Sequence, residues 1–155
     1  MGRIYTVQFN GTAITAQQDL FEIVPAATDI VKIHETGISQ TSDVGDAEEE
    51  LLSILLKSGQ TTSGTPSTAV NIEKRLIGDA TAGLTAEKNN TTKATAGTIV
   101  THYAWSWNVR VPFQVIFTPE TQPILAPSRR CTLELATTPA DELTCSAYMV
   151  IEEIG

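Results

Sequence analysis

The sequence predicts an all-β protein, an antiparallel β-sandwich with about eight strands. Apolar residues alternate with polar ones, from Tyr5, Val7 and Phe9 near the start to Tyr148 and Val150 near the end, and this is the period of half-buried strands. Residues that favour turns separate these stretches. A chain of 155 residues, 41% of them hydrophobic, can bury one sizeable core but is short for two domains. We therefore expect a single domain over residues 1–155, with the strand number of a jelly roll.

Each predicted strand ends at residues with turn chemistry. Gly and Asn tolerate the backbone of tight turns, and Pro cannot donate a hydrogen bond to a sheet. Such residues occur at Asn10-Gly11, Pro25-Ala26-Ala27, Val44-Gly45-Asp46, Pro119 to Pro127 and Thr138-Pro139. In chain order the predicted strands are Arg3–Phe9, Ala13–Thr15 running into Asp19–Val24, Asp29–Gln40, Glu49–Lys57, Thr98–Arg110, Phe113–Thr118, Arg130–Ala136 and Thr144–Glu153.

Residues 46–59 fit two structures. An acidic first turn, a lysine near the end and the following Gly59 are typical of a helix. Against this, Leu52, Ile54 and Leu56 share one face of a strand, and a central strand of a sandwich can be apolar on much of both faces. Local propensity alone favours the helix.

The segment from Ser58 to Gly97 changes composition to Thr, Ser, Ala, Gly and Asn. We interpret it as a long loop insertion (58–97) that holds a short helix around Ala69–Gly78. A loop of this length is uncommon and often functional, so it is a candidate interaction surface. The alternative is a solvated insertion without contacts. We expect deletion of Thr61–Thr68 to leave the sandwich folded.

The net charge of −8 argues against nucleic acid as a partner. Basic residues never cluster beyond Lys74-Arg75 and Arg129-Arg130. No segment approaches the ~20 apolar residues of a membrane span, and no signal-peptide pattern is present, so we expect no membrane partner and synthesis in a cytoplasm. The acidic residues gather at Asp43, Asp46, Glu48, Glu49 and Glu50, a pattern more typical of a solvated loop than of a Ca²⁺ site.

The sequence contains no nucleophile elbow, phosphate loop or dinucleotide fingerprint. We therefore assign no catalytic, cofactor-binding or metal-binding residue, and we expect a structural or binding protein rather than an enzyme. Carboxylate pairs assemble in space, so the sequence leaves a catalytic carboxylate pair open as an alternative.

His34 and His102 lack metal-ligand spacing and are interpreted as structural or surface residues. Cys131 and Cys145 could form a cross-strand disulfide if their strands were hairpin neighbours, but a reducing cytoplasm favours two buried free thiols.

Aromatic residues mark one face of the strand predicted at Thr98–Arg110. Trp105 and Trp107 lie one pleat apart on the same face. They could form a sugar-stacking platform or a subunit interface, but packing in the core is the preferred interpretation because aromatic side chains bury large areas. Tyr103 and Val109 share this face, whereas His102, Ala104, Ser106 and Asn108 lie on the other.

Several short sequence segments, spread over the whole chain, resemble those of a known family. They are Gly2-Arg3-Ile4-Tyr5-Thr6-Val7, Gln17-Gln18-Asp19-Leu20-Phe21-Glu22-Ile23, the loop from Gln40 to Glu50, and Ile151-Glu152-Glu153-Ile154-Gly155. With these, the chain resembles the small jelly-roll capsid cement or head decoration proteins of tailed bacteriophages. In related chains the segment after the acidic loop looks like a strand, so we assign 49–57 to a strand.

The resemblance implies a non-enzymatic virion protein without a cofactor. Such a protein binds the outside of an icosahedral phage head, where its partner is the major capsid protein, and it is often a homotrimer. Its expected location is the virion exterior after synthesis in the host cytoplasm. The alternative is a virion tail or surface module that recognises host carbohydrate through Trp105 and Trp107. A cupin-like enzyme is the weakest interpretation, because it needs clustered histidines and the chain has only two.

Overall fold

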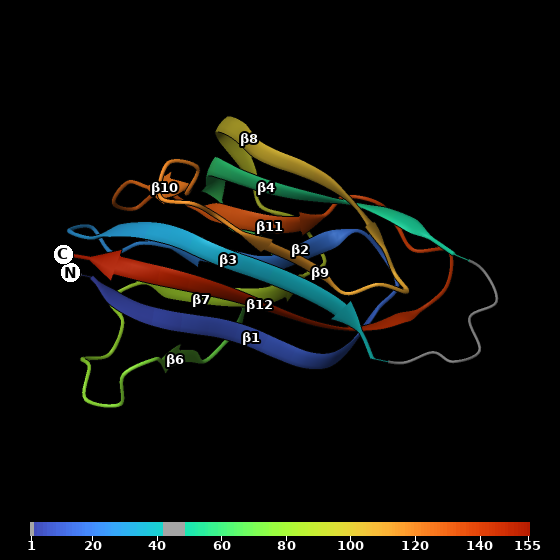
Figure 1. Ribbon diagram of the computed structural model, residues 1–155. Helices are drawn as coiled ribbons and strands as arrows, with labels where there is room; N and C mark the ends of the chain where they lie inside the picture. The colour runs from blue at the N-terminus through green and yellow to red at the C-terminus, as the bar shows by residue number, and fades with distance from the viewer. Residues whose placement is uncertain (1, 42–48) are drawn as a thin grey trace.

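The computed structural model describes residues 2–41 and 49–155, which form two antiparallel sheets packed face to face (Figure 1). No helix occurs among the described residues. Sheet 1 has the order β10-β3-β12-β1-β6, and β9 also pairs with β3. Its strands are β1 (Arg3–Ile14), β3 (Ile30–Gln40), β6 (Ile72–Lys74), β9 (Phe113–Ile116), β10 (Ile124–Leu125) and β12 (Leu143–Ile154).

Sheet 2 lies behind sheet 1 in the view of Figure 1 and has the order β5-β7-β2-β11-β4-β8. One of its edges is the long strand β8, whose only partner among the described strands is β4. The strands of sheet 2 are β2 (Gln18–Val24), β4 (Leu51–Thr62), β5 (Thr68–Ala69), β7 (Thr85–Asn90), β8 (Thr95–Asn108) and β11 (Cys131–Leu135).

Eight of these strands make the expected jelly-roll sandwich. They are arranged as β9-β3-β12-β1 in sheet 1 and β2-β11-β4-β8 in sheet 2, so the chain passes repeatedly from one sheet to the other, as a double Greek key requires. Each of the eight corresponds to a predicted strand. The prediction that Ala13–Thr15 runs into Asp19–Val24 is wrong, however, because Ala13 and Ile14 form the end of β1 and pair with β12. The all-β sandwich prediction is confirmed.

The core lies between the sheets, where the alternating apolar residues point. Tyr5 and Val7 of β1 are fully buried, and Phe9 packs against Phe21 of the opposite sheet with ring centroids 5.2 Å apart. Because alternate residues of a strand face opposite sides, the polar residues between them lie on the outer surfaces. Strands β2 and β11 differ, since nearly all their residues are buried on both faces.

The segment 58–97 is not a long loop, and the prediction of a helix around Ala69–Gly78 is wrong. Strand β4 continues to Thr62, β8 already begins at Thr95, and β5, β6 and β7 lie between them. β7 extends sheet 2 beyond β2, and β6 pairs with the edge of β1. These added strands sit at sheet edges with many residues exposed, so they lack the apolar alternation that reveals a half-buried strand.

The assignment of Glu49–Lys57 to a strand is confirmed from Leu51 onward. Leu52, Ile54 and Leu56 face the core and are at most 2% exposed, so the helix alternative is excluded. The pairing of β4 with β8 shifts register between Ser58 and Gln60. Gly59 has φ +95° there, and a Cβ at this position would lie 2.1 Å from the Thr98 carbonyl oxygen, so this bulge requires glycine.

Candidate interaction surface and the polar network beside it

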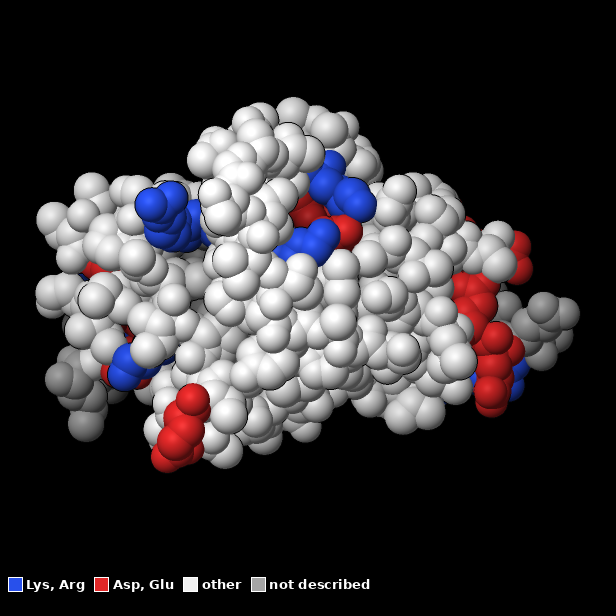
Figure 2. Space-filling view, turned by 90° about the horizontal axis from the view of Figure 1, so that it is seen from above, with Lys and Arg blue, Asp and Glu red and all other residues white. Residues whose placement is uncertain are grey.

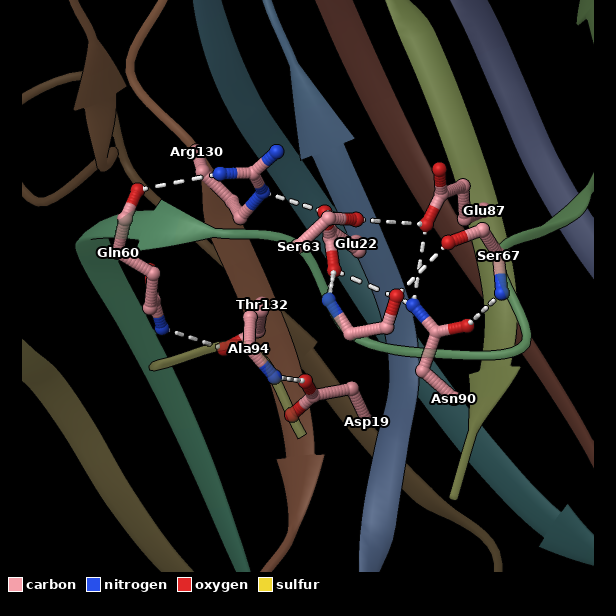
Figure 3. Close-up of polar contacts among 11 residues, drawn as sticks. Asp19, Glu22, Gln60, Ser63, Ser67, Glu87, Asn90, Ala94, Arg130 and Thr132 are labelled. Atoms are coloured by element: carbon pink, nitrogen blue, oxygen red, sulfur yellow. Dashed lines mark hydrogen bonds and ion pairs between the residues drawn. The ribbon is translucent and has the colours of Figure 1, made fainter. Parts of the chain in front are cut away.

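The outer face of sheet 2 carries a buried cluster of acidic side chains. Asp19 and Glu22 of β2 and Glu134 of β11 are 1%, 2% and 4% exposed. Two segments supply hydrogen bonds to them: the strap Ser63–Ser67, which follows β4, and Thr91–Ala94, which precedes β8 (Figure 3). Buried carboxylates are stable only when they are paired or hydrogen-bonded.

Glu22 anchors the strap. The Ser63 hydroxyl donates to its Oε1 at 2.7 Å and the Gly64 amide to its Oε2 at 2.9 Å. Asn90 Nδ2 donates to the same Oε2 at 3.2 Å, and Arg130 Nε forms an ion pair with Oε1 (Figure 3). The Asn90 Oδ1 also accepts from the Ser67 amide at 2.8 Å. The strap is therefore fastened at both ends to strands of sheet 2.

Glu134 and Asp19 occupy different electrostatic environments. Burial raises the pKa of Glu134, but hydrogen bonds from Lys57 at 2.6 Å and Lys93 at 2.9 Å, with their charges, outweigh it, so the pKa lies below its ordinary value. Burial raises the pKa of Asp19 to about 7; the Ala94 amide, which donates to Asp19 Oδ2 at 2.6 Å, opposes this shift, and Glu134 and Glu22 add to it. Asp19 is thus neutral for much of the acidic pH range.

This network fits a structural task. Both oxygens of Glu22 and of Glu134 already accept hydrogen bonds from protein donors. A catalytic acid or base must instead reach a substrate proton. The network holds the strap and the entry to β8 on the sheet, and so it fixes the position of the free sheet edge beside it.

That edge carries a surface with few charges. Ile99 and Val100 of β8 and Ile124 of β10 are 44%, 50% and 58% exposed. Val100 and Ile124 line one groove of about 480 Å³ between the two sheet edges. Figure 2 looks onto this side of the molecule and shows a broad expanse without Lys, Arg, Asp or Glu, beside a cluster of blue and red side chains near the middle of the face. We call Val100 and Ile124 with this groove the apolar surface; Ser58, Thr61, Thr98 and Arg129 also line the groove. Exposed large apolar side chains beside a groove are a feature of interaction sites.

Trp107 belongs to the core, as preferred from the sequence, whereas Trp105 and Tyr103 are half-buried and pack against the core. Trp107 is 2% exposed, and its Nε1 donates to the Val111 carbonyl at 2.9 Å. Trp105 packs against Phe113 and Phe117, with centroid distances of 5.5 and 6.3 Å. Trp105 contacts Phe113 of β9 across the sandwich. Because Trp107 is buried, the two tryptophans do not form a shared exposed platform for a sugar.

The two histidines are hydrogen-bonded within the fold. His34 Nε2 lies 3.0 Å from Glu152 Oε2, and its Nδ1 lies 2.7 Å from Gln122 Nε2. His102 Nε2 lies 2.7 Å from the Ser58 hydroxyl, and burial lowers the pKa of His102. Within residues 2–41 and 49–155 no cluster of three potential metal-binding side chains occurs.

The cysteines lie in different sheets, Cys131 in β11 and Cys145 in β12, so their strands are not hairpin neighbours. Both are buried free thiols, and burial raises the pKa of each to about 12. This arrangement agrees with the interpretation of two free thiols.

Most of the acidic run lies outside the described residues, including Asp43, Asp46 and Glu48. Glu50, which is described, accepts a hydrogen bond from the Ala140 amide at 2.8 Å. In the described part of the chain no helix is long and apolar enough to cross a membrane.

Sequence reasoning missed the buried network. Asp19, Glu22 and Glu134 lie in predicted strands, and no role was assigned to them from the sequence. Their covering residues come from segments distant in sequence, so no local spacing signals the contact. A weak signal was available in the presence of isolated acidic residues within otherwise apolar strands.

Comparisons with known proteins give no family. No protein-family model matches the sequence, and no curated protein matches it. Among solved structures, VP17, a capsid protein of bacteriophage P23-77, aligns with 96% of this chain and 90% of its own length at 9% sequence identity and a TM-score of 0.13. A likeness that weak carries no argument about this chain.

Proposed function

We propose that this protein is a non-enzymatic capsid cement protein, which binds the outer surface of an icosahedral phage head and stabilises it. The observation that carries the proposal is the apolar surface at the edges of both sheets. It supports a protein partner because Val100 and Ile124 expose apolar side chains there, beside Ser58, Thr61, Thr98 and Arg129, which also line the groove. The resemblance in sequence supplies the identity of that partner, the major capsid protein.

The physical basis of such a function is linkage. A protein that binds only the assembled shell shifts the equilibrium toward the shell by mass action. A rigid jelly roll suits this task, because little conformational entropy is lost when a preformed surface docks. We propose that the protein acts as a homotrimer on the virion exterior, since several weak contacts to the lattice then add up to stable attachment.

Co-sedimentation with phage heads tests the proposal. Heads of the encoding phage are prepared without this protein and mixed with the wild type, Val100→Asp or Ile124→Asp. We expect the wild type to sediment with the heads and both variants to remain in the supernatant, because each buries an unpaired charge in the contact. The matched control is Ile77→Asp, which makes the same chemical change at a residue that is 94% exposed in the turn after β6.

Two results would overturn the proposal. One is a wild type that stays in the supernatant with saturating amounts of heads. The other is sedimentation of both Val100→Asp and Ile124→Asp with the heads at the wild-type level, which would show that the apolar surface does not contact the head. Light scattering tests the trimer separately, and a monomer at every accessible concentration would contradict it.

A further inference from the structure

A second groove, of about 690 Å³, crosses the outer face of sheet 1. Four strands build its floor, and their register places Gln8, Tyr148, Gly37 and Gln114 in one row across β1, β12, β3 and β9. Ser146 and Ser39 pair in a neighbouring row. These strands form the front layer in Figure 1. The groove is thus lined by residues that alternate with the core residues of the same strands.

Tyr148 lies across the floor of this groove. A Cβ on Gly37 would lie 2.3 Å from Tyr148 Cε1 and 2.9 Å from its hydroxyl oxygen, so the ring covers the glycine backbone. The hydroxyl donates to Glu35, and it accepts from Gln114 Nε2 at 2.9 Å. Gln114 Nε2 also donates to Glu35 Oε1 at 2.7 Å. One face of the half-buried Tyr148 ring therefore packs on Gly37, and its hydroxyl is hydrogen-bonded to Glu35 and Gln114. The opposite face of the ring faces the groove.

Neutral polar groups surround the ring. Gln8 and Asn10 are exposed, and Ser39 is half-buried. Asn10 Oδ1 accepts from the Ser146 hydroxyl at 2.6 Å, which leaves the Asn10 amide nitrogen to donate. Of the described residues that line the groove, Lys88 is the one with a charge. The groove therefore combines a flat aromatic face with amide and hydroxyl groups.

We propose that this groove binds a short saccharide, with one sugar ring stacked on Tyr148. A sugar ring has an apolar C–H face and a rim of hydroxyls, each of which donates and accepts. An aromatic face matches the first, and amide side chains match the second because they also donate and accept. The volume lies within the range of about 300–1,000 Å³ that is usual for small-ligand sites. The groove lies on sheet 1 and does not share residues with the apolar surface, so the two proposals stand independently.

The test is a glycan array of bacterial surface saccharides, followed by calorimetry with the strongest ligand found. We expect Tyr148→Ala to weaken binding by about tenfold or more, and Tyr148→Phe, which keeps the ring, to weaken it less. Gly37→Ala should act like Tyr148→Ala, because its Cβ occupies the place of the ring. Gln8→Ala, at an exposed position, tests the rim without touching the ring. The control is Gln17→Ala, an amide outside the groove.

Absence of binding to every glycan at millimolar concentration would overturn the inference, as would unchanged affinity in both Gln8→Ala and Gly37→Ala. Sedimentation of Tyr148→Ala with phage heads should match the wild type. That measurement separates failure of this site from failure of the cement proposal.

Discussion

Asp19 should make the stability of the fold fall as the pH rises. Its side chain is 1% exposed, and burial raises its pKa from 3.8 to about 7. Between these two values the folded state keeps the proton and the unfolded state has lost it. Because the unfolded state then binds fewer protons, the free energy of unfolding decreases with pH across this window.

The size of this effect follows from the shift. Each pH unit between the two pKa values changes the free energy of unfolding by about 1.4 kcal/mol, and the effect levels off above the folded-state pKa. From about pH 5 to about pH 8 the contribution of Asp19 is therefore a loss of roughly 2.5 kcal/mol. Asp19→Asn cannot ionise, and its Oδ1 can still accept the hydrogen bond from the Ala94 amide.

Urea denaturation of the wild type and Asp19→Asn at several pH values measures this, with the fluorescence of the buried Trp107 as the signal. We expect the difference in unfolding free energy between variant and wild type to grow by roughly 2.5 kcal/mol in favour of the variant from about pH 5 to about pH 8. Asp141→Asn, at an exposed turn, is the control for the loss of one negative charge. Parallel pH profiles of wild type and Asp19→Asn would refute the reasoning.

Three further predictions concern the strap, the thiols and the bulge. Glu22→Ala leaves Arg130 and the Gly64 amide without the carboxylate that accepts from them. We expect a loss of about 3–5 kcal/mol in unfolding free energy and faster hydrogen exchange at the amides of Gly64 and Ser67. Unchanged exchange at these amides would show that Glu22 does not hold the strap. Cys131 and Cys145 should both resist a thiol reagent in the native protein, because they are buried and burial raises the pKa of each to about 12. Both should react in denaturant. Fewer than two reactive thiols after unfolding would indicate a disulfide. Gly59→Ala should cost about 1–3 kcal/mol or more, since φ is +95° and the new Cβ meets Thr98, whereas Gly78→Ala, with open space around it, should be nearly neutral.

The eight jelly-roll strands could be predicted from the sequence because each has one face in the core. In β4, Leu52, Ile54 and Leu56 alternate with polar or less buried residues. The helix-end signals in the same segment favoured a helix, however, and the family resemblance decided for the strand. Strands β5, β6, β7 and β10 could not be predicted in this way. They are short or polar, and their existence depends on the strands with which they pair: β7 for β5, β1 for β6, β2 for β7 and β3 for β10. A sequence pattern records burial, whereas edge pairing is decided by tertiary structure.

The candidate sites depended even more on tertiary structure. Tyr148 belongs to an alternating strand, and the sequence gives no sign that Gly37, far along the chain, provides the space on which its ring lies. Trp105 and Trp107 were the more obvious aromatic pair, yet Trp107 is buried in the core and the half-buried Trp105 packs against Phe113 of β9. Aromatic spacing alone therefore does not separate a binding platform from core packing.

The strap changes how the interaction surface must be tested. Deletion of Thr61–Thr68 was expected from the sequence to leave the sandwich folded, but it would remove Ser63 and Gly64, two of the donors to Glu22. A buried carboxylate that loses its donors is costly, and β8, whose pairing with β4 reaches Thr62, would lose part of its partner strand. Loss of head binding in such a deletion would follow from a damaged sheet as readily as from a lost contact. Single charges at Val100 and Ile124 avoid this ambiguity, because both side chains are about half exposed and their substitution leaves the network around Glu22 intact.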